Sequence, residues 1–188
     1  MKTLKTITIA FLCLATLVAC KNDDDNAEAA FVLTNSNLAG DHDLSFLTVN
    51  AQVTQVVAGV DVVADINGQG DTFQTTANFT SNGTFIFDGQ FRINTTVTIN
   101  GGDPTPRPVI VNLDNETGSY TIGGNADTIV FTGVMDVQIT PDVAIDLFNG
   151  AWDVTLFNET ELRLQKMENT SIDGIDTVAN VEIRFLRQ

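Results

Sequence analysis

Hydrophobic and polar residues alternate regularly between Phe85 and Asn100. The odd positions carry Phe, Ile, Val, Gly and Thr, and from Asp88 onward the even positions carry only polar or charged residues. A period of two places successive side chains on opposite faces of a strand and does not fit a helix. The segment is therefore predicted to be a long antiparallel strand with one buried face, in which Gly89 is the expected position of a bulge or bend.

Shorter segments of the same character occur along the rest of the chain. Further strands are predicted at Asp43–Gln55, Val60–Ile66, Thr72–Thr80, Pro108–Asp114, Ser119–Ile122, Thr128–Thr140, Trp152–Phe157, Glu161–Met167 and Val181–Leu186. Turns are predicted between them at Asn67-Gly68, Asn82-Gly83, Gly101-Gly102, Asn115–Gly118, Gly123–Asn125, Asn149-Gly150 and Asp173-Gly174. Pro141–Phe148 is open between a strand and a helical turn.

These elements predict an all-β protein. Eight to ten strands with short connections favour an antiparallel up-and-down β-barrel, because closure removes the sheet edges that would otherwise pair with other chains. A two-sheet β-sandwich is the alternative that the same pattern allows.

The N-terminus is typical of an exported protein. Lys2 and Lys5 precede an apolar run, Ile7–Val18, that is shorter than the roughly 20 residues needed to span a bilayer. Residues 1–19 are therefore interpreted as a signal peptide. The sequence Leu17-Val18-Ala19-Cys20 resembles a bacterial lipobox, which implies that Cys20 becomes the lipidated first residue and carries diacylglycerol and an acyl chain such as palmitate.

The region after Cys20 is polar. Residues 20–37 are interpreted as the lipidated cysteine and a tether, and residues 38–188 as the barrel domain. The stretch Lys21–Asp25 resembles the acidic export signal of surface lipoproteins of Bacteroidetes, and a solvated tether is the alternative. We expect a lipid-anchored protein of the outer membrane, with exposure at the cell surface as one possibility.

The composition of the chain excludes two classes of protein, nucleic-acid-binding proteins and disordered acidic chains. The 188 residues include 24 Asp and Glu against 9 Lys and Arg, and the formal net charge is −15. This balance excludes a nucleic-acid partner, because phosphate binding needs clustered basic side chains. A hydrophobic content of 43% excludes a disordered acidic chain. The length fits a single domain.

The residues that most enzymes rely on are scarce. Both cysteines lie within the first 20 residues and His42 is the single histidine, which excludes catalytic triads, Cys-His pairs and histidine-based zinc sites. We expect no enzymatic activity and no cofactor. Asp65, Asn67 and Asp71 are spaced like the first ligands of a calcium loop, but the closing position holds Thr76 instead of Glu. An ordinary turn is the favoured interpretation, and the three residues form a weak calcium candidate.

Several motifs resemble one protein family. The sequence Asn37-Leu38-Ala39-Gly40-Asp41-His42-Asp43-Leu44 resembles the first strand of the lipocalin-like lipoproteins of Bacteroidetes, with His42 in place of their usual Trp. Asn78–Phe85 is similar to the central hairpin of that family, and Gly118–Ile122 to a later strand. The ending Glu182-Ile183-Arg184-Phe185 fits its last strand, where Arg184 or Arg187 would pack against the first. The resemblance covers most of residues 37–188.

This resemblance implies non-catalytic binding of a small hydrophobic ligand inside the barrel. The candidates for the cavity wall are Phe85, Phe87, Phe91, Ile93, Val97, Phe131, Ile183 and Phe185. The same phenylalanines would equally suit a dry core, because an eight-stranded barrel is just wide enough for either arrangement. The alternative function is a surface adhesion or assembly module that binds protein or glycan through its loops. The expected partners are the membrane, through the lipid anchor, and a small apolar molecule.

Overall fold

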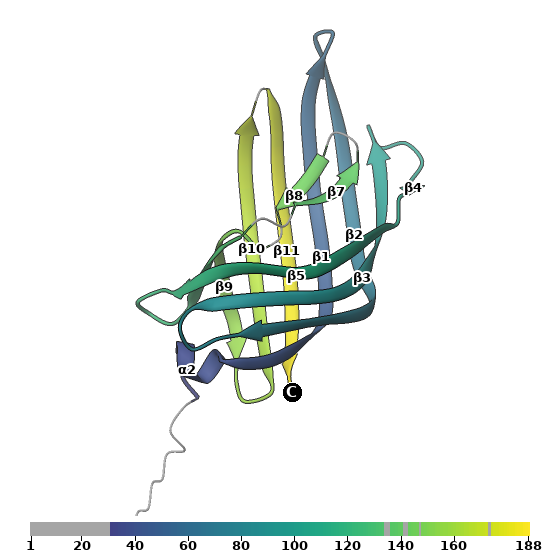
Figure 1. Cartoon of the computed structure of the whole chain (residues 1–188). Coiled ribbons are helices and arrows are strands. Elements are labelled where there is room, and N and C mark those ends of the chain that lie inside the picture. The colour runs from purple at the N-terminus through teal and green to yellow at the C-terminus, as the bar shows by residue number, and fades with distance from the viewer. Residues whose placement is uncertain (1–30, 134–135, 141–142, 147, 173) are drawn as a thin grey trace, which may run out of the picture. The chain divides into compact units, whose positions relative to one another are not determined.

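The computed structural model describes residues 31–133, 136–140, 143–146, 148–172 and 174–188 (Figure 1). Within these ranges the chain forms a short helix, α2 (Asn35–Leu38), followed by strands. The strands are β1 (Gly40–Val57), β2 (Val60–Phe79), β3 (Thr84–Ile99), β4 (Thr105–Pro106), β5 (Val109–Ile122), β6 (Thr128–Thr132), β7 (Asp136–Thr140), β8 (Val143–Asp146), β9 (Gly150–Phe157), β10 (Glu161–Ile172) and β11 (Ile175–Arg187).

The strands close into a ring. One antiparallel sheet has the order β2-β1-β11-β10-β9-β6-β5-β3-β4, and β2 also pairs with β3, so that β4 lies outside the ring as a short extra strand on β3. The eight ring strands follow one another up and down around the barrel, and the first strand pairs with the last. The predicted barrel is therefore confirmed, and the two-sheet sandwich is wrong because no open edge divides the ring into two sheets.

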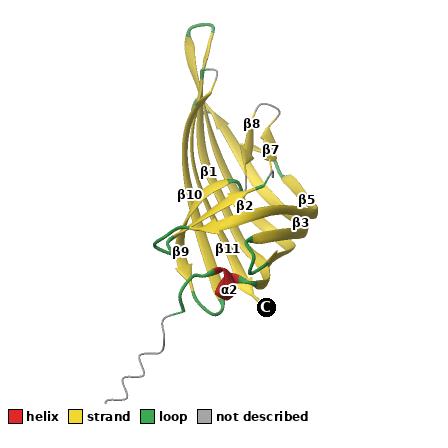
Figure 2. Cartoon of the chain, turned by 60° about the vertical axis from the view of Figure 1, so that its left-hand side comes forward, coloured by secondary structure: helices red, strands yellow, loops and turns green. Residues whose placement is uncertain are grey.

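The two ends of the barrel differ. At one end, here called the α2 end, α2 and the C-terminus lie side by side (Figures 1 and 2). At the other, here called the hairpin end, the β1–β2 and β10–β11 hairpins project beyond the remaining ring strands (Figure 1). The tip of the first hairpin is Ala58-Gly59, whose positive φ angles of 53° and 82° suit a tight hairpin turn.

The predicted turn at Asn67-Gly68 is wrong, and β2 is one strand instead of two. Asn67 pairs with Asn50 of β1 on one side and with Thr96 of β3 on the other. Two long neighbours therefore hold this dipeptide extended, although its sequence is typical of a turn. The absence of a side chain at Gly68 leaves room for Ile93, because a Cβ atom at Gly68 would lie 3.0 Å from Cγ2 of Ile93.

β5 is also longer than predicted, and the turn expected at Asn115–Gly118 is wrong. Asp114 and Asn115 together lie opposite Asp88, so the extra residue forms a β-bulge, and Asn115 has a φ of 52°. On the facing strand Gly89 has a φ of 109° and sits at the shift in register. The irregularity predicted at Gly89 is therefore confirmed as a bend with positive φ, and the bulge itself lies opposite it on β5.

The segment predicted as the single strand Thr128–Thr140 is divided between β6 and β7. β6 pairs with β5 and β9 in the ring, whereas β7 pairs with β8 in a separate two-stranded sheet. Of the two interpretations of Pro141–Phe148, the helical turn is wrong, because Val143–Asp146 is the strand β8. Alternation in the sequence identifies a strand but does not say which strand it pairs with.

Packing begins before residue 38, the predicted start of the domain. The side chains of Leu33 and Leu38 are buried, and Thr34 accepts a hydrogen bond from the backbone N–H of Asn37 to cap the N-terminus of α2. The guanidinium group of Arg187 donates to the carbonyl oxygens of Asn37 (2.5 Å) and Ala39 (2.9 Å). The last strand thus fixes the segment that enters the first one. Cys20 and residues 1–30 lie outside the described residues.

Candidate functional site

The barrel interior at the α2 end is filled by aromatic rings. This aromatic cluster consists of Phe79, Phe85, Phe87, Tyr120, Phe131, Phe148, Trp152 and Phe185, all buried. Phe148 lies in the middle of it, with its ring centroid 4.3 Å from that of Phe87 and 6.2 Å from that of Trp152. Phe85, Phe87, Phe131 and Phe185 were candidates for a cavity wall, and the structure places all four in this core.

The remaining candidates follow the barrel toward the hairpin end. Phe91, Ile93 and Val97 lie on β3, and Ile183 lies on β11, where it pairs with Leu47 and Leu164. All four side chains are buried. The eight predicted wall residues therefore do face the interior, but they are divided between the filled end and a second region, in which Phe91 stacks on Phe73 with centroids 6.2 Å apart.

The interior surface of this second region is less tightly covered. Ile93 and Ile183 are fully buried, but five other inward-facing aliphatic side chains keep a small exposed fraction: 8% at Ala51, 7% at Val53, 9% at Val97, 7% at Val111 and 6% at Leu113. In the aromatic cluster the corresponding fractions do not exceed 2%. These five side chains are apolar, face the interior and are less completely covered than the aromatic cluster, so they form the candidate binding surface.

Three buried polar atoms have no hydrogen-bond partner in the described part of the chain. They are Oγ1 of Thr75, Oγ1 of Thr95 and Nε1 of Trp152. Burying such a group without a partner costs about 1–3 kcal/mol, so unpartnered groups of this kind call for an explanation. Alternation already places Thr95 on the buried face of its strand, but the sequence does not show that any of the three groups lacks a partner, because that depends on the strand register.

His42, which replaces the usual Trp of the resembled family, lies at the α2 end of the barrel. Its ring is buried, packs edge-on against Phe79 with centroids 5.3 Å apart, and places Nδ1 3.1 Å from the carbonyl oxygen of Gly40. Of the two arginines considered as its partner, Arg187 pairs with it across the strands, whereas Arg184 lies over the ring of Phe46. Burial lowers the pKa of His42 below its ordinary value of 6.5, against the opposing effect of the Gly40 carbonyl.

This lowered pKa predicts a dependence of stability on pH. The unfolded chain binds the proton of His42 more readily than the folded one, so stability is highest above about pH 6.5 and falls as the pH drops from there through the folded-state pKa. We expect the urea midpoint to fall between about pH 7.5 and 5.5, and His42→Gln to flatten this decline. Because the chain has a single histidine, an equal slope in the variant would contradict the assignment.

The calcium candidates do not converge. Asp65 and Asp71 lie on the same strand, six residues and therefore about 20 Å apart. Asp65 accepts a hydrogen bond from Gln52, and Asp71 forms a two-point contact with Arg92, at 2.8 Å and 2.6 Å, that lowers the pKa of its carboxyl group to about 2. No cluster of metal-ligating side chains is found among the residues that the structure describes.

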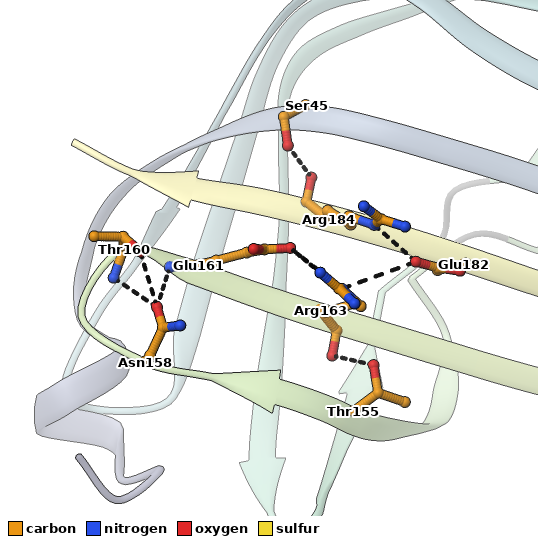
Figure 3. Close-up of polar contacts among 8 residues, drawn as sticks. All are labelled: Ser45, Thr155, Asn158, Thr160, Glu161, Arg163, Glu182 and Arg184. Atoms are coloured by element: carbon orange, nitrogen blue, oxygen red, sulfur yellow. Dashed lines mark hydrogen bonds and ion pairs between the residues drawn. The ribbon is translucent and has the colours of Figure 1, made fainter. Parts of the chain in front are cut away.

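The outer face of β10 and β11 carries a ladder of charges (Figure 3). Arg163 and Arg184 lie directly opposite each other, a like-charge pair that the neighbouring carboxylates offset. Glu182 lies 2.7 Å from Nε of Arg184 and 3.9 Å from Nε of Arg163, and Glu161 lies 3.0 Å from Nη2 of Arg163. The arrangement pairs each arginine with a carboxylate and has the geometry of strand stabilisation.

Ring closure and the apolar interior define an all-β protein of the antiparallel up-and-down barrel class. Comparisons with protein-family models, with curated proteins and with solved structures found no match to this chain. No helix in the described part of the chain has the length and apolar content needed to span a bilayer.

Proposed function

We propose that this protein is a lipid-anchored lipoprotein of the cell envelope whose lipocalin-like barrel binds a small hydrophobic molecule without chemical conversion. The observation that carries this proposal is the apolar interior wall around Ala51, Val53 and Val97, which is less tightly covered than the aromatic cluster. An apolar interior surface with a few unpartnered polar groups nearby has the character of a small-molecule site. The scarcity of catalytic residue types supports a binding function over an enzymatic one.

The anchor rests on the lipobox sequence around Cys20. We expect cells that express the full chain and are fed an alkyne analogue of palmitate to label it, and Cys20→Ser to abolish the label, because the acyl chain requires the amino group that cleavage before this cysteine exposes. Cys13, inside the apolar run, provides the matched control, since Cys13→Ser is expected to keep full labelling. Labelling that survives Cys20→Ser would contradict the proposed anchor.

Native mass spectrometry tests the binding function. The chain, expressed with its own leader and extracted in mild detergent, is weighed first folded and then denatured. We expect the folded protein to carry an additional mass that denaturation releases and that solvent extraction identifies as a hydrophobic small molecule. The proposal would be contradicted if the folded and the denatured protein had equal masses, and if this were also true of protein produced in its native host.

A surface adhesion or assembly module is the second candidate function. The observation that favours it is the tip of the β1–β2 hairpin, where Val56, Val57 and Val60 expose more than half of their surface. Exposed apolar side chains grouped together are typical of contact surfaces for other macromolecules. Equal folded and denatured masses, together with capture of a partner that is lost when these valines are replaced with serine, would support this function instead.

A further inference from the structure

The outer face of β11, β1, β2 and β3 carries two rows of side chains that run across the four strands. Within a row, each residue lies directly opposite the next in the backbone pairing, and such residues project from the same face of a sheet. The first row is Val178, Gln52, Asp65 and Thr98, and the second is Asn180, Asn50, Asn67 and Thr96. Their neighbours along the strands, among them Ala51, Ile66 and Val97, are buried in the interior, so both rows face outward.

The two rows are polar but almost uncharged. Apart from Val178 and Asp65, every member has an amide or a hydroxyl side chain, and no member is basic. Asp65, the one carboxylate, accepts a hydrogen bond of 2.8 Å from Nε2 of Gln52. An anionic ligand finds no positive partner in these rows, and the formal net charge of −15 repels it from the protein as a whole. Hydrogen bonding is therefore the means by which this face selects a ligand.

A groove of about 530 Å³ lies over the two rows. Its lining includes Asn50, Gln52, Asp65, Asn67, Thr98 and Val178. Small-molecule sites have volumes of about 300–1,000 Å³, so the groove has the size of such a site. Because neighbouring strands lie about 4.8 Å apart, the four strands present polar groups over about 14 Å. The groove therefore has room for a short oligomer laid across the strands.

Several polar groups in the groove are free to bind a ligand. Asn50 and Asn67 are exposed and lie directly opposite each other, so their amide groups are neighbours. In the described part of the chain neither amide forms a hydrogen bond, and the same is true of the hydroxyl group of Thr98. Amide and hydroxyl groups both donate and accept hydrogen bonds. Two adjacent amides therefore match a ligand that carries neighbouring hydroxyl groups.

From this arrangement we infer that the groove binds a neutral carbohydrate. Adjacent hydroxyl groups of the sugar form hydrogen bonds with the amides of Asn50 and Asn67, and an apolar C–H face of the sugar lies against Val178, which is 50% exposed. An apolar ligand would cover the same amides without giving them partners, which is unfavourable. The groove and the interior surface around Ala51 and Val53 lie on opposite faces of the same strands, so the inference goes beyond the proposed function and does not depend on it.

Affinity electrophoresis tests the inference. The full chain, expressed with its own leader and extracted in mild detergent, is run in native gels that contain laminarin, galactomannan, xyloglucan or amylopectin, and in a gel that contains the anionic polygalacturonate. We expect at least one of the neutral polysaccharides to retard the protein, and polygalacturonate to leave its migration unchanged. Retardation by none of the neutral polysaccharides, or equal retardation by polygalacturonate, would overturn the inference.

Substitutions in the groove assign the binding to its amides. Titration calorimetry with an oligosaccharide of the retarding polymer measures the dissociation constant. Asn50→Ala combined with Asn67→Ala is expected to raise this constant about tenfold or more, because each substitution removes a hydrogen bond to the sugar. Asn67→Asp, which keeps the shape of the side chain but removes its donors, is expected to weaken binding as well.

Asn112→Ala is the matched control. Asn112 is an exposed asparagine on β5, outside the groove, and its truncation is expected to leave the affinity unchanged. All of these side chains are exposed, so the urea midpoints of the variants should stay close to that of the unmodified protein. Undiminished affinity in the folded double variant would overturn the inference. The comparison of neutral and anionic polysaccharides in the unmodified protein decides the question even if a variant fails to fold.

Discussion

Replacing Phe148 with alanine is expected to destabilise the barrel by about 3–5 kcal/mol, the usual cost of removing a buried phenylalanine from a core. Its ring contacts four members of the aromatic cluster, with centroid distances of 4.3 Å to Phe87, 6.0 Å to Phe131 and Phe185, and 6.2 Å to Trp152. These partners come from four different strands of the ring. Their positions are fixed by backbone pairing, so they cannot close the gap left by the missing ring.

The measurement is the urea or thermal unfolding midpoint of a chain that contains the compact unit Phe31–Gln188. Ile110→Ala serves as the control, because the side chain of Ile110 is 66% exposed and its truncation should change stability by less than about 0.5 kcal/mol. If Phe148→Ala lost no more stability than this control, the ring would not be part of the core.

The second large effect is expected at Gly89. A Cβ atom at this position would lie 1.9 Å from the carbonyl oxygen of Gln74, which is well inside van der Waals contact. Its φ of 109° is in addition a conformation that residues with a side chain rarely adopt. Backbone strain of about 1–3 kcal/mol and a similar cost of overpacking together predict a loss of about 4 kcal/mol for Gly89→Ala.

Gly124 provides a matched control for this substitution. It lies in the loop between β5 and β6, and a Cβ atom there would meet nothing within 4 Å. Gly124→Ala is therefore expected to unfold at nearly the same urea concentration as the unmodified protein, whereas Gly89→Ala unfolds at a much lower one or fails to fold. Equal midpoints for the two variants would refute the close approach of Gly89 to the backbone of Gln74 on β2.

The sequence predicts best where a pattern is local. Alternation correctly predicts the buried side chains of β3 from Phe85 to Val97, apart from the half-buried Gly89, but it is wrong for Ile99, which is 56% exposed. Asn67-Gly68 is misread because its turn propensity is local, whereas the pairing that keeps it extended comes from two distant strands. The effect of pairing on both sides outweighs the preference of a dipeptide.

The candidate site is less predictable for the same reason. Phe148 lies outside any alternating run, so nothing in its neighbourhood marks it as the middle of the core. The sequence likewise does not show that the hydroxyl group of Thr75 is buried without a partner, because this depends on the strands around it. The groups that give the interior its chemical character are thus identified by register, which the sequence alone leaves open.

The pairing of β1 with β11 has a consequence for how the chain folds. The barrel closes through contacts between its two sequence ends, and the hydrogen bond between Arg187 and Asn37 joins residues 150 positions apart. Such a high contact order predicts slow folding, because loop closure must precede the contacts that stabilise it. Until the last strand is available, β1 has an unpaired edge that can pair with other chains, so the incomplete chain is prone to aggregate until its C-terminal strand has been made.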